Sequence, residues 1–418
     1  MRRVALGLAV VLVLATPASA SAAVGWSRVA APTSAGLAAV SFPSGRLGVA
    51  VGARGVVLRT TDGGVTWRAR PSGTTHDLAA VDMLAGTLEG WATGADSTLL
   101  RTTSGGVTWT AVAVPASATL TAVRSLAPSA CCALTSNGLC IATTDAGLTW
   151  TVSRVDGQGR AMRGVARAGG RLVAVGDGGC ACVSDDLGST WATASAPTTV
   201  DLAAVSLAAD GRGWAVGDRG TLLRTLDGGS TWTRQTSGVA RDLCAVRAVD
   251  ATVAWAVGAA GVVLKTVTGG SRWIAQPVPS TAALAGLAVA GSSRAWAVGS
   301  AGVVLRTADG GAGPVTLGYP TAPGRVVRGR LFTAYGTISP RHADGIVAVR
   351  LLCYRRVSGA WRFDRSLPAR TLTLGAGSTR WVVTFALPSR GLWRLRALHP
   401  DDVAHVRALS PTRELLVD

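Results

Sequence analysis

The octapeptide TLDGGSTW at residues 225–232 decides the fold of this 418-residue chain, because it recurs at a fixed spacing. Six variants end in Trp residues that are 42, 41, 41, 41 and 41 positions apart. They read TTDGGVTW, TTSGGVTW, TTDAGLTW, SDDLGSTW, TLDGGSTW and TVTGGSRW, and they close at Trp67, Trp109, Trp150, Trp191, Trp232 and Trp273. A seventh copy begins at Thr307 and breaks off at Gly313-Pro314. Such a period indicates a repeat architecture.

Each 41-residue unit has the pattern of four short strands. A second motif runs in phase with the first: GWATG at Trp91, GWAVG at Trp214, and AWAVG at Trp255 and Trp296. Short alternating runs separated by turn residues, without helical periodicity, indicate β-strands. Four-stranded units of this length are typical of β-propeller blades, which must stack radially to bury their faces.

The octapeptide itself is predicted to have a structural role, stabilising the turn of a β-hairpin. An Asp or Ser in the turn accepts backbone N–H bonds, the glycines permit positive φ, and the Trp ring covers the turn. The residues expected in this role are Asp62, Trp67, Ser104, Trp109, Asp145, Trp150, Asp186, Trp191, Asp227, Trp232, Thr268, Trp273, Asp309 and Trp26.

The two ends of the repeat region are expected to meet. Trp26 lies 41 residues before Trp67 and has no turn motif before it, whereas the seventh copy has the turn but no Trp. The segment Val24 to Val29 should therefore supply the outermost strand of the last blade, which removes exposed sheet edges. The prediction is a seven-bladed propeller over residues 24–314.

These motifs carry a family resemblance. The octapeptide is the Asp-box, or bacterial neuraminidase repeat. Combined with the upstream GWAVG motif and TLLRTLDGGSTW, it makes residues 24–314 resemble the photosystem II stability/assembly factor-like family of seven-bladed propellers. The resemblance implies a non-enzymatic scaffold, and photosynthetic members of the family are thought to assist early photosystem II assembly by gripping a reaction-centre subunit.

Residues 315–418 should form a second, all-β domain. Alternating runs continue beyond the repeats, which favours a small immunoglobulin/fibronectin-like β-sandwich. Stretches such as YGTISPRHADG resemble sandwich modules of secreted actinobacterial wall proteins, a likeness that implies adhesion or spacing. The segment has 16 Arg against 6 acidic residues. We hypothesise docking on an anionic cell-surface polymer or phospholipid headgroups; the alternative is a solvated basic surface.

The first 23 residues have the features of a secretory signal peptide. Met1-Arg2-Arg3 is followed by the apolar run Val4 to Ala15 and by the small residues Ala18-Ser19-Ala20. We therefore expect a secreted or cell-surface protein, peripheral to a membrane at most. Export permits disulfides, but the seven cysteines match no zinc spacing and their connectivity stays open.

Hydrolysis is the main alternative to binding, because Asp-box propellers include glycosidases. A sialidase needs a Tyr nucleophile within the propeller. The three tyrosines, Tyr319, Tyr335 and Tyr354, all lie beyond the propeller, so a sialidase is excluded. A glycoside hydrolase using an Asp pair stays possible. The candidate carboxylates outside the turn motif are Asp77, Asp96, Asp156, Asp177, Asp201, Asp218 and Asp242. No cofactor, metal or nucleic-acid motif is present.

The favoured interpretation is a scaffold that recognises a protein or an envelope polymer on one propeller face. The Asp-box turns should share one face with the turn after each innermost strand. The opposite face would carry the remaining short turns and the connections between blades. Exposed Arg suits protein or carboxylate recognition. The arginines proposed for that opposite face are Arg54, Arg160, Arg163, Arg219 and Arg241.

Overall fold

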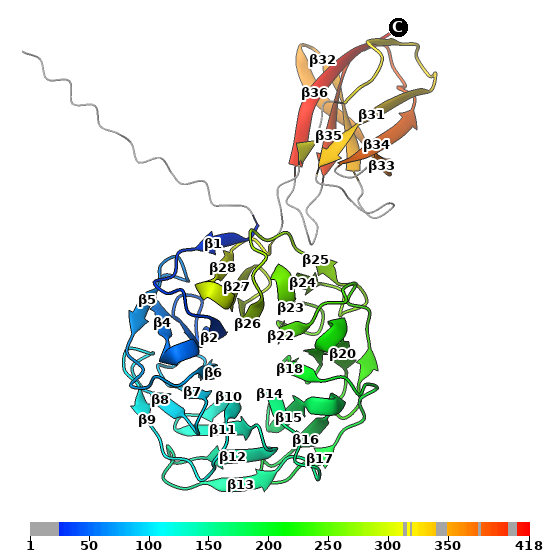
Figure 1. Ribbon diagram of the computed structural model, residues 1–418. Coiled ribbons are helices and arrows are strands. Elements are labelled where there is room, and N and C mark those ends of the chain that lie inside the picture. Colours follow the sequence, from blue (N-terminus) through cyan, green and yellow to red (C-terminus); the bar gives the residue numbers. More distant parts are fainter. Residues whose placement is uncertain (1–24, 312–315, 318–319, 340–348, 375–377, 400–407) are drawn as a thin grey trace, which may run out of the picture.

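Seven four-stranded antiparallel sheets form a ring in the computed structural model (Figure 1). The structure describes residues 25–311, 316–317, 320–339, 349–374, 378–399 and 408–418. The predicted signal peptide, residues 1–23, and the predicted domain boundary at residues 314 and 315 lie outside these ranges. The all-β, seven-bladed fold is confirmed. None of the described helices is long and apolar enough to cross a membrane.

Blades 1 to 6 each take their four strands from one continuous stretch of chain. Blade 1 comprises β2 (Leu37–Ser41), β3 (Gly48–Gly52), β4 (Val57–Thr60) and β5 (Arg68–Arg70), and blade 2 comprises β6 (Leu78–Met83), β7 (Gly90–Gly94), β8 (Leu99–Thr102) and β9 (Thr110–Ala111). Blade 3 comprises β10 (Leu120–Ala127), β11 (Ala130–Thr135), β12 (Leu139–Thr143) and β13 (Thr151–Arg154), and blade 4 comprises β14 (Met162–Ala168), β15 (Arg171–Gly176), β16 (Ala181–Ser184) and β17 (Ala192–Thr193). Blade 5 comprises β18 (Leu202–Leu207), β19 (Gly213–Gly217), β20 (Leu222–Thr225) and β21 (Thr233–Arg234), and blade 6 comprises β22 (Leu243–Ala248), β23 (Ala254–Gly258), β24 (Val263–Thr266) and β25 (Ile274–Ala275).

Blade 7 joins the two ends of the repeat region. It contains β26 (Leu284–Ala290), β27 (Arg294–Gly299) and β28 (Val304–Thr307), and its outermost strand is β1 (Ser27–Val29). β1 pairs antiparallel with β28, with Ser27 opposite Arg306. The backbone N–H of Gly25 donates to Asp309 Oδ2 at 2.7 Å. The N-terminal segment thus supplies the strand that the last Asp-box lacks.

The second strand of each blade forms the core of the ring. In β19 and β23 every residue is buried, and Trp91, Trp214, Trp255 and Trp296 are at most 1% exposed. Because both faces of a blade pack against neighbouring blades, these strands are apolar on both sides rather than alternating. The Trp296 Nε1–H of blade 7 donates to the Gly63 carbonyl of blade 1 at 2.9 Å, which connects the blades that flank the seam.

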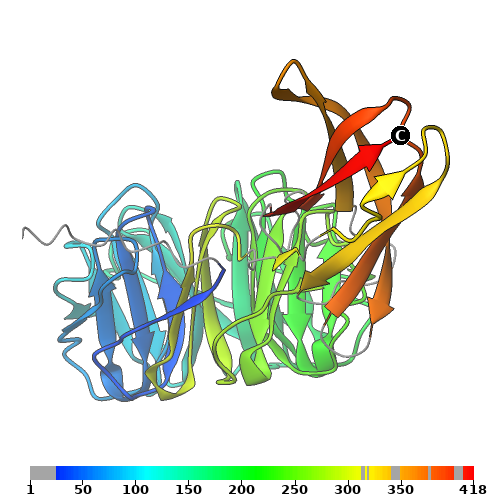
Figure 2. The same ribbon diagram turned by 90° about the horizontal axis from the view of Figure 1, so that it is seen from above.

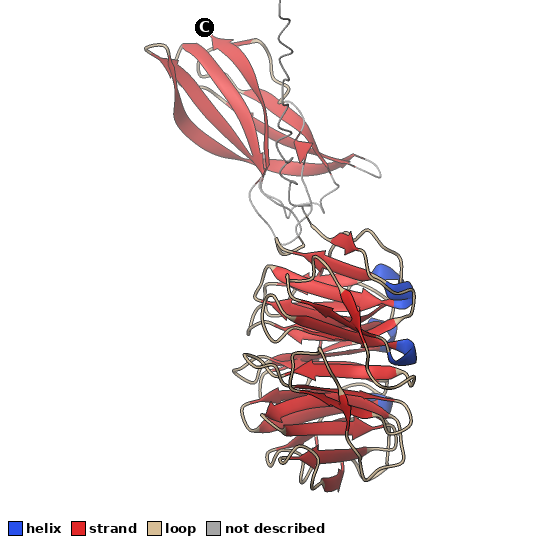
Figure 3. Cartoon of the chain, turned by 90° about the vertical axis from the view of Figure 1, so that its left-hand side faces the viewer, coloured by secondary structure: helices blue, strands red, loops and turns tan. Residues whose placement is uncertain are grey.

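Five short 3₁₀ turns lie on one face of the disc (Figure 3). They are η1 (Ala53–Gly55), η2 (Asp177–Gly179), η3 (Asp218–Gly220), η4 (Ala259–Gly261) and η5 (Ser300–Gly302). The last residue of η1, Gly55, has φ +68°, and a Cβ there would lie 2.0 Å from the Thr74 carbonyl oxygen. Glycine is therefore required where this turn approaches the connection between blades.

The C-terminal module is one nearly closed sheet. Its strands are β29 (Thr316–Leu317), β30 (Arg325–Val326), β31 (Phe332–Ser339), β32 (Val349–Val357), β33 (Ala360–Leu374), β34 (Ser378–Phe385), β35 (Gly391–His399) and β36 (Ala408–Val417), in the order β29-β31-β34-β33-β32-β35-β36-β30. The first part of β33 pairs with β32 and its second part with β34, so one long strand passes through both halves of the sheet. Trp381 and Trp393 are fully buried in its core. The immunoglobulin-like identity of the module stays a prediction.

Candidate partner-binding site

Backbone hydrogen bonds define the two faces of the propeller. On one face, Asp-box turns bond to the loops between the first and second strands, for example Gly63 N–H to the Arg46 carbonyl at 2.9 Å. On the other face, the turns after the second strands bond to the connections between blades, for example Ala53 N–H to the Gly36 carbonyl at 2.9 Å. We call these the Asp-box face and the connection face. Figure 2 shows the sheets of the disc from above relative to Figure 1.

The Asp-box carboxylates are saturated with internal hydrogen bonds. Asp62 Oδ1 accepts the N–H groups of Val65 at 2.9 Å and Thr66 at 3.0 Å, and its Oδ2 accepts the Thr66 hydroxyl at 2.6 Å. Burial opposes ionisation of Asp62, but the bonds from Thr66 and Thr60 outweigh it and lower the pKa to about 2. The same pattern recurs at Asp145, Asp186 and Asp227. Groups held in this way brace turns and offer nothing to a substrate.

In two Asp-box turns a hydroxyl stands in place of the carboxylate. Ser104 Oγ accepts the Thr108 N–H at 2.9 Å, and Thr268 Oγ1 accepts the Arg272 N–H at 3.2 Å. The Trp that ends a box can bond to its own turn. Trp232 Nε1–H donates to the Gly229 carbonyl at 3.0 Å, and Trp191 Nε1–H donates to the Gly188 carbonyl at 3.1 Å.

The five arginines predicted for partner binding lie on the connection face, in two different environments. Arg160 Nε donates to Asp156 Oδ2 at 2.6 Å. Arg163 forms ion pairs with both Asp177 and Asp201. Arg54, Arg219 and Arg241 are exposed. The binding role of the set stays a prediction, but neighbouring carboxylates already neutralise two of its members.

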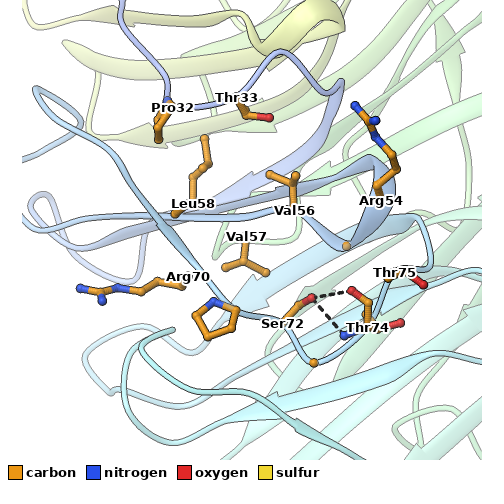
Figure 4. Close-up of a pocket in the computed structure, with 14 residues that line it drawn as sticks. Pro32, Thr33, Arg54, Val56, Val57, Leu58, Arg70, Ser72, Thr74 and Thr75 are labelled. Atoms are coloured by element: carbon orange, nitrogen blue, oxygen red, sulfur yellow. Dashed lines mark hydrogen bonds between the residues drawn. The ribbon is translucent and has the colours of Figure 1, made fainter.

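Arg54 and Arg219 line equivalent grooves on this face. The groove at blade 1, about 670 Å³, lies between Pro32, Arg54, Arg70 and the connection Ser72–Thr75 (Figure 4). A groove of about 620 Å³ occurs at Arg219 and Arg234 of blade 5. Each groove therefore has two arginines. Arg54 and Arg219 occupy the same position of their repeats, whereas Arg70 and Arg234 come from adjacent positions of the outermost strand.

Three of the Asp residues suggested for a glycosidase hold turns on the connection face. Asp77 Oδ1 accepts the Arg54 N–H at 2.7 Å, Asp201 Oδ1 accepts the Gly178 N–H at 2.8 Å, and Asp242 Oδ1 accepts the Arg219 N–H at 2.8 Å. Each of these three carboxylates caps a turn, and the residue that donates the N–H has positive φ. Within the described ranges, no group of three or more His, Cys, Asp or Glu side chains could hold a metal ion.

An arginine cluster that sequence analysis missed lies at the Asp-box end of the central channel. Asp82, Arg124, Arg167 and Arg247 line a cavity of about 730 Å³ there. Arg124 Nη1 is 3.3 Å from Asp82 Oδ1. Among the described residues, the hydrogen-bond partner of Arg247 is the carbonyl of its neighbour Val246, 3.2 Å from Nη1. We call these four residues the channel cluster. It brings three guanidinium groups together with one carboxylate.

The cluster has an unbalanced positive potential. Burial lowers the pKa of Arg247 and the nearby Arg124 lowers it further, while Asp82 opposes the change. The pKa therefore moves in the direction expected for a cation without sufficient compensating charge. Asp82, Arg124 and Arg247 occupy the same repeat position, directly after Val81, Val123 and Val246 of the innermost strands. Aligning the seven innermost strands would have revealed this variable position.

Comparison with known proteins agrees with the seven blades and the Asp-box turns. A family model described as "Photosynthesis system II assembly factor YCF48" matches residues 18–183 and 183–313, which is more than half of the chain. The chain belongs to the YCF48 family. This is a family of assembly factors, not of enzymes, and the match covers the propeller.

Two solved YCF48 structures share the propeller fold. One, described as "YCF48 bound to D1 peptide", is 21% identical with a TM-score of 0.58 and covers 69% of this chain and 99% of that chain. The other, YCF48 from Cyanidioschyzon merolae, is 23% identical with a TM-score of 0.57 and covers 68% of this chain and 98% of that chain. No curated protein matches the chain.

Proposed function

We propose that this protein is an exported, non-enzymatic scaffold whose propeller holds an anionic peptide segment of a partner protein. The channel cluster carries the proposal: three arginines and one aspartate line a cavity that is open at the Asp-box face. A carboxylate entering this cavity would offset the excess positive charge and accept charge-assisted hydrogen bonds. Support for a peptide partner comes from the related YCF48 structure that has a D1 peptide bound.

The exposed Arg54, Arg219 and Arg241 offer a second contact area on the opposite face. Grooves are present at Arg54 and Arg219, and the three guanidinium groups have no carboxylate partner among the described ion pairs. The C-terminal module supplies the second half of the proposal, attachment of the propeller to an anionic surface of the cell envelope. Its arginine excess supports this role because exposed guanidinium groups attract anionic surfaces at low salt.

Peptide binding tests the propeller half. Fluorescence anisotropy would compare a labelled acidic peptide that ends in a free carboxylate with the same peptide amidated. We expect amidation, or the substitution Arg247→Gln, to weaken binding by about 10- to 100-fold, the range for hydrogen bonds to a charged group. Arg272→Gln is the matched control, because Arg272 is an exposed arginine of an Asp-box turn.

Equal affinities for Arg247→Gln and Arg272→Gln would remove the channel cluster from the proposal. If Arg54→Gln and Arg219→Gln together abolished binding while Arg247→Gln did not, the site would lie on the connection face.

A further inference from the structure

One end of the C-terminal module combines exposed arginines with exposed aliphatic side chains. Three segments meet there: the loop Val327–Leu331, the hairpin turn between β32 and β33, and the loop that leads into β35. Hydrogen bonds join them, from Gly329 N–H to the Leu387 carbonyl at 3.0 Å and from Arg355 Nη2 to the Arg390 carbonyl at 3.4 Å. We call this end the tip; it is the end at which Figure 1 marks the C-terminus.

The tip is strongly basic. Its exposed arginines are Arg328, Arg330, Arg356, Arg362 and Arg390. Among the described residues, Asp418 supplies a carboxylate side chain at this end. Its Oδ2 lies 3.9 Å from Arg325 Nε. The other nearby acids are paired, Asp364 with Arg365 at 2.5 Å and Glu414 with Arg394 at 2.6 Å. The exposed guanidinium groups of the tip therefore face solvent with almost no compensating negative charge.

Aliphatic side chains project among these arginines. Leu331 is 73% exposed, Val327 is 56% exposed and Val357 is 38% exposed, and all three lie at or beside loop apices. Isolated exposed apolar residues are common on soluble proteins. Here they are concentrated on neighbouring segments of one end and are flanked by cations, a pattern that suits the boundary between lipid headgroups and acyl chains.

We propose that the tip binds the surface of an anionic phospholipid membrane, with its arginines on the phosphate groups and Leu331, Val327 and Val357 in the interfacial layer. This deepens the attachment role proposed for the module and is independent of what the propeller holds. A soluble anionic polymer is the other occupant that the arginines alone would allow, but the exposed aliphatic side chains beside them favour a membrane surface.

Vesicle sedimentation tests the proposal. The chain from residue 24 onward keeps every described residue of both domains and lacks the apolar leader, which would bind vesicles by itself. We expect it to pellet with vesicles of phosphatidylcholine and 30% phosphatidylglycerol, to stay in solution with phosphatidylcholine alone, and to be released as the salt concentration rises.

Two variants separate charge from insertion. Replacing Arg330, Arg356 and Arg390 by Gln should lower the partition coefficient by about 100-fold, since each basic residue contributes about fivefold. Leu331→Ser should lower it several-fold without changing the charge. The control changes Arg46, Arg68 and Arg272 to Gln, which removes the same charge from exposed sites of the propeller and should leave binding nearly unchanged. Circular dichroism checks that each variant folds.

Equal losses in the tip variant and in the control would overturn the proposal, as would absence of binding to anionic vesicles. Binding to a soluble anionic polymer is measured in parallel. If wild type and Leu331→Ser bound this polymer equally, and also bound vesicles equally, the tip would be a polymer site. Peptide binding by the propeller is measured separately, so failure of the tip leaves that result standing.

Discussion

Replacing Trp26 by Ala should open the ring at its seam. Trp26 is 6% exposed and packs edge to face on Trp255, with the ring centroids 5.7 Å apart. Removing a buried Trp side chain costs about 3–5 kcal/mol. Without it, β1 keeps about 1 kcal/mol for each of its three paired residues and about 2 kcal/mol for the hydrogen bond from Gly25 N–H to the Asp309 side chain.

These remaining contacts do not hold the strand in place. Ordering the five residues from Gly25 to Val29 costs about 1–2 kcal/mol each in backbone entropy. This entropic cost is similar to the stabilisation that all contacts of β1 give when Trp26 is present. It exceeds the stabilisation that remains after the substitution. β1 should therefore detach while the other six blades stay folded.

Trp273→Ala is the matched control. Trp273 is 8% exposed and packs edge to face on Trp214 at 6.2 Å, but its strand, β25, is continuous with the chain on both sides. Both variants should lose about 3–5 kcal/mol in urea unfolding. Hydrogen exchange read by mass spectrometry should show rapid exchange at Ser27–Val29 only in Trp26→Ala. Equal protection of this segment in the two variants would refute the reasoning about the seam.

Three further predictions concern ionisable groups. Because hydrogen bonds depress the pKa of Asp62 to about 2, its contribution to stability is present above about pH 4 and is lost as the pH falls from 4 to 2; Asp62→Asn should flatten acid unfolding in this range, and an unchanged profile followed by fluorescence would contradict it. Lys265 is 6% exposed, donates to the Gly310 carbonyl at 2.9 Å, and has a pKa lowered by burial to about 8, against the opposing charge of Asp309. The unfolded chain then binds more protons between pH 8 and 10.5, so stability should rise with pH by up to about 3 kcal/mol in wild type but not in Lys265→Met, as urea titrations at several pH values would show. Among the cysteines, Cys244 is partly exposed and the other six are buried, so iodoacetamide should label Cys244 first in the native protein; peptide mapping that finds Cys132 or Cys353 labelled before it would contradict this order.

The sequence predicts the propeller well because its fold depends on repeated local chemistry. The Asp-box turn and the buried second strand are each set by a few residues, and a 41-residue period shows how the units stack. The pairing of β1 with the last blade was also predictable, because the Asp-box copy at Asp309 lacks its final Trp and Trp26 supplies one. The family match agrees with this part of the chain.

The candidate sites were harder to predict because they depend on where side chains from different blades converge. Arg124 and Arg247 are 123 residues apart in sequence, and the channel brings them to one cavity. Conversely, Arg160 and Arg163 were proposed because of their position on one face. Their ion pairs with Asp156 and Asp177 depend on side-chain geometry, which the repeat pattern does not encode. In the C-terminal module, which has no repeat, strand order could not be inferred from alternating runs.

The two ends of the chain segment that form blade 7 also determine when the ring can close during folding. Blades 1 to 6 are each encoded by one stretch of chain, so each can form as it is synthesised. The seventh must wait until residue 307 has been made and the first residues are free to return, across a separation of 279 positions between Ser27 and Arg306. Until then the molecule is an open arc, with the edge of β28 available for pairing with another chain. Anything that holds the first residues elsewhere would therefore delay maturation and favour association between incomplete copies.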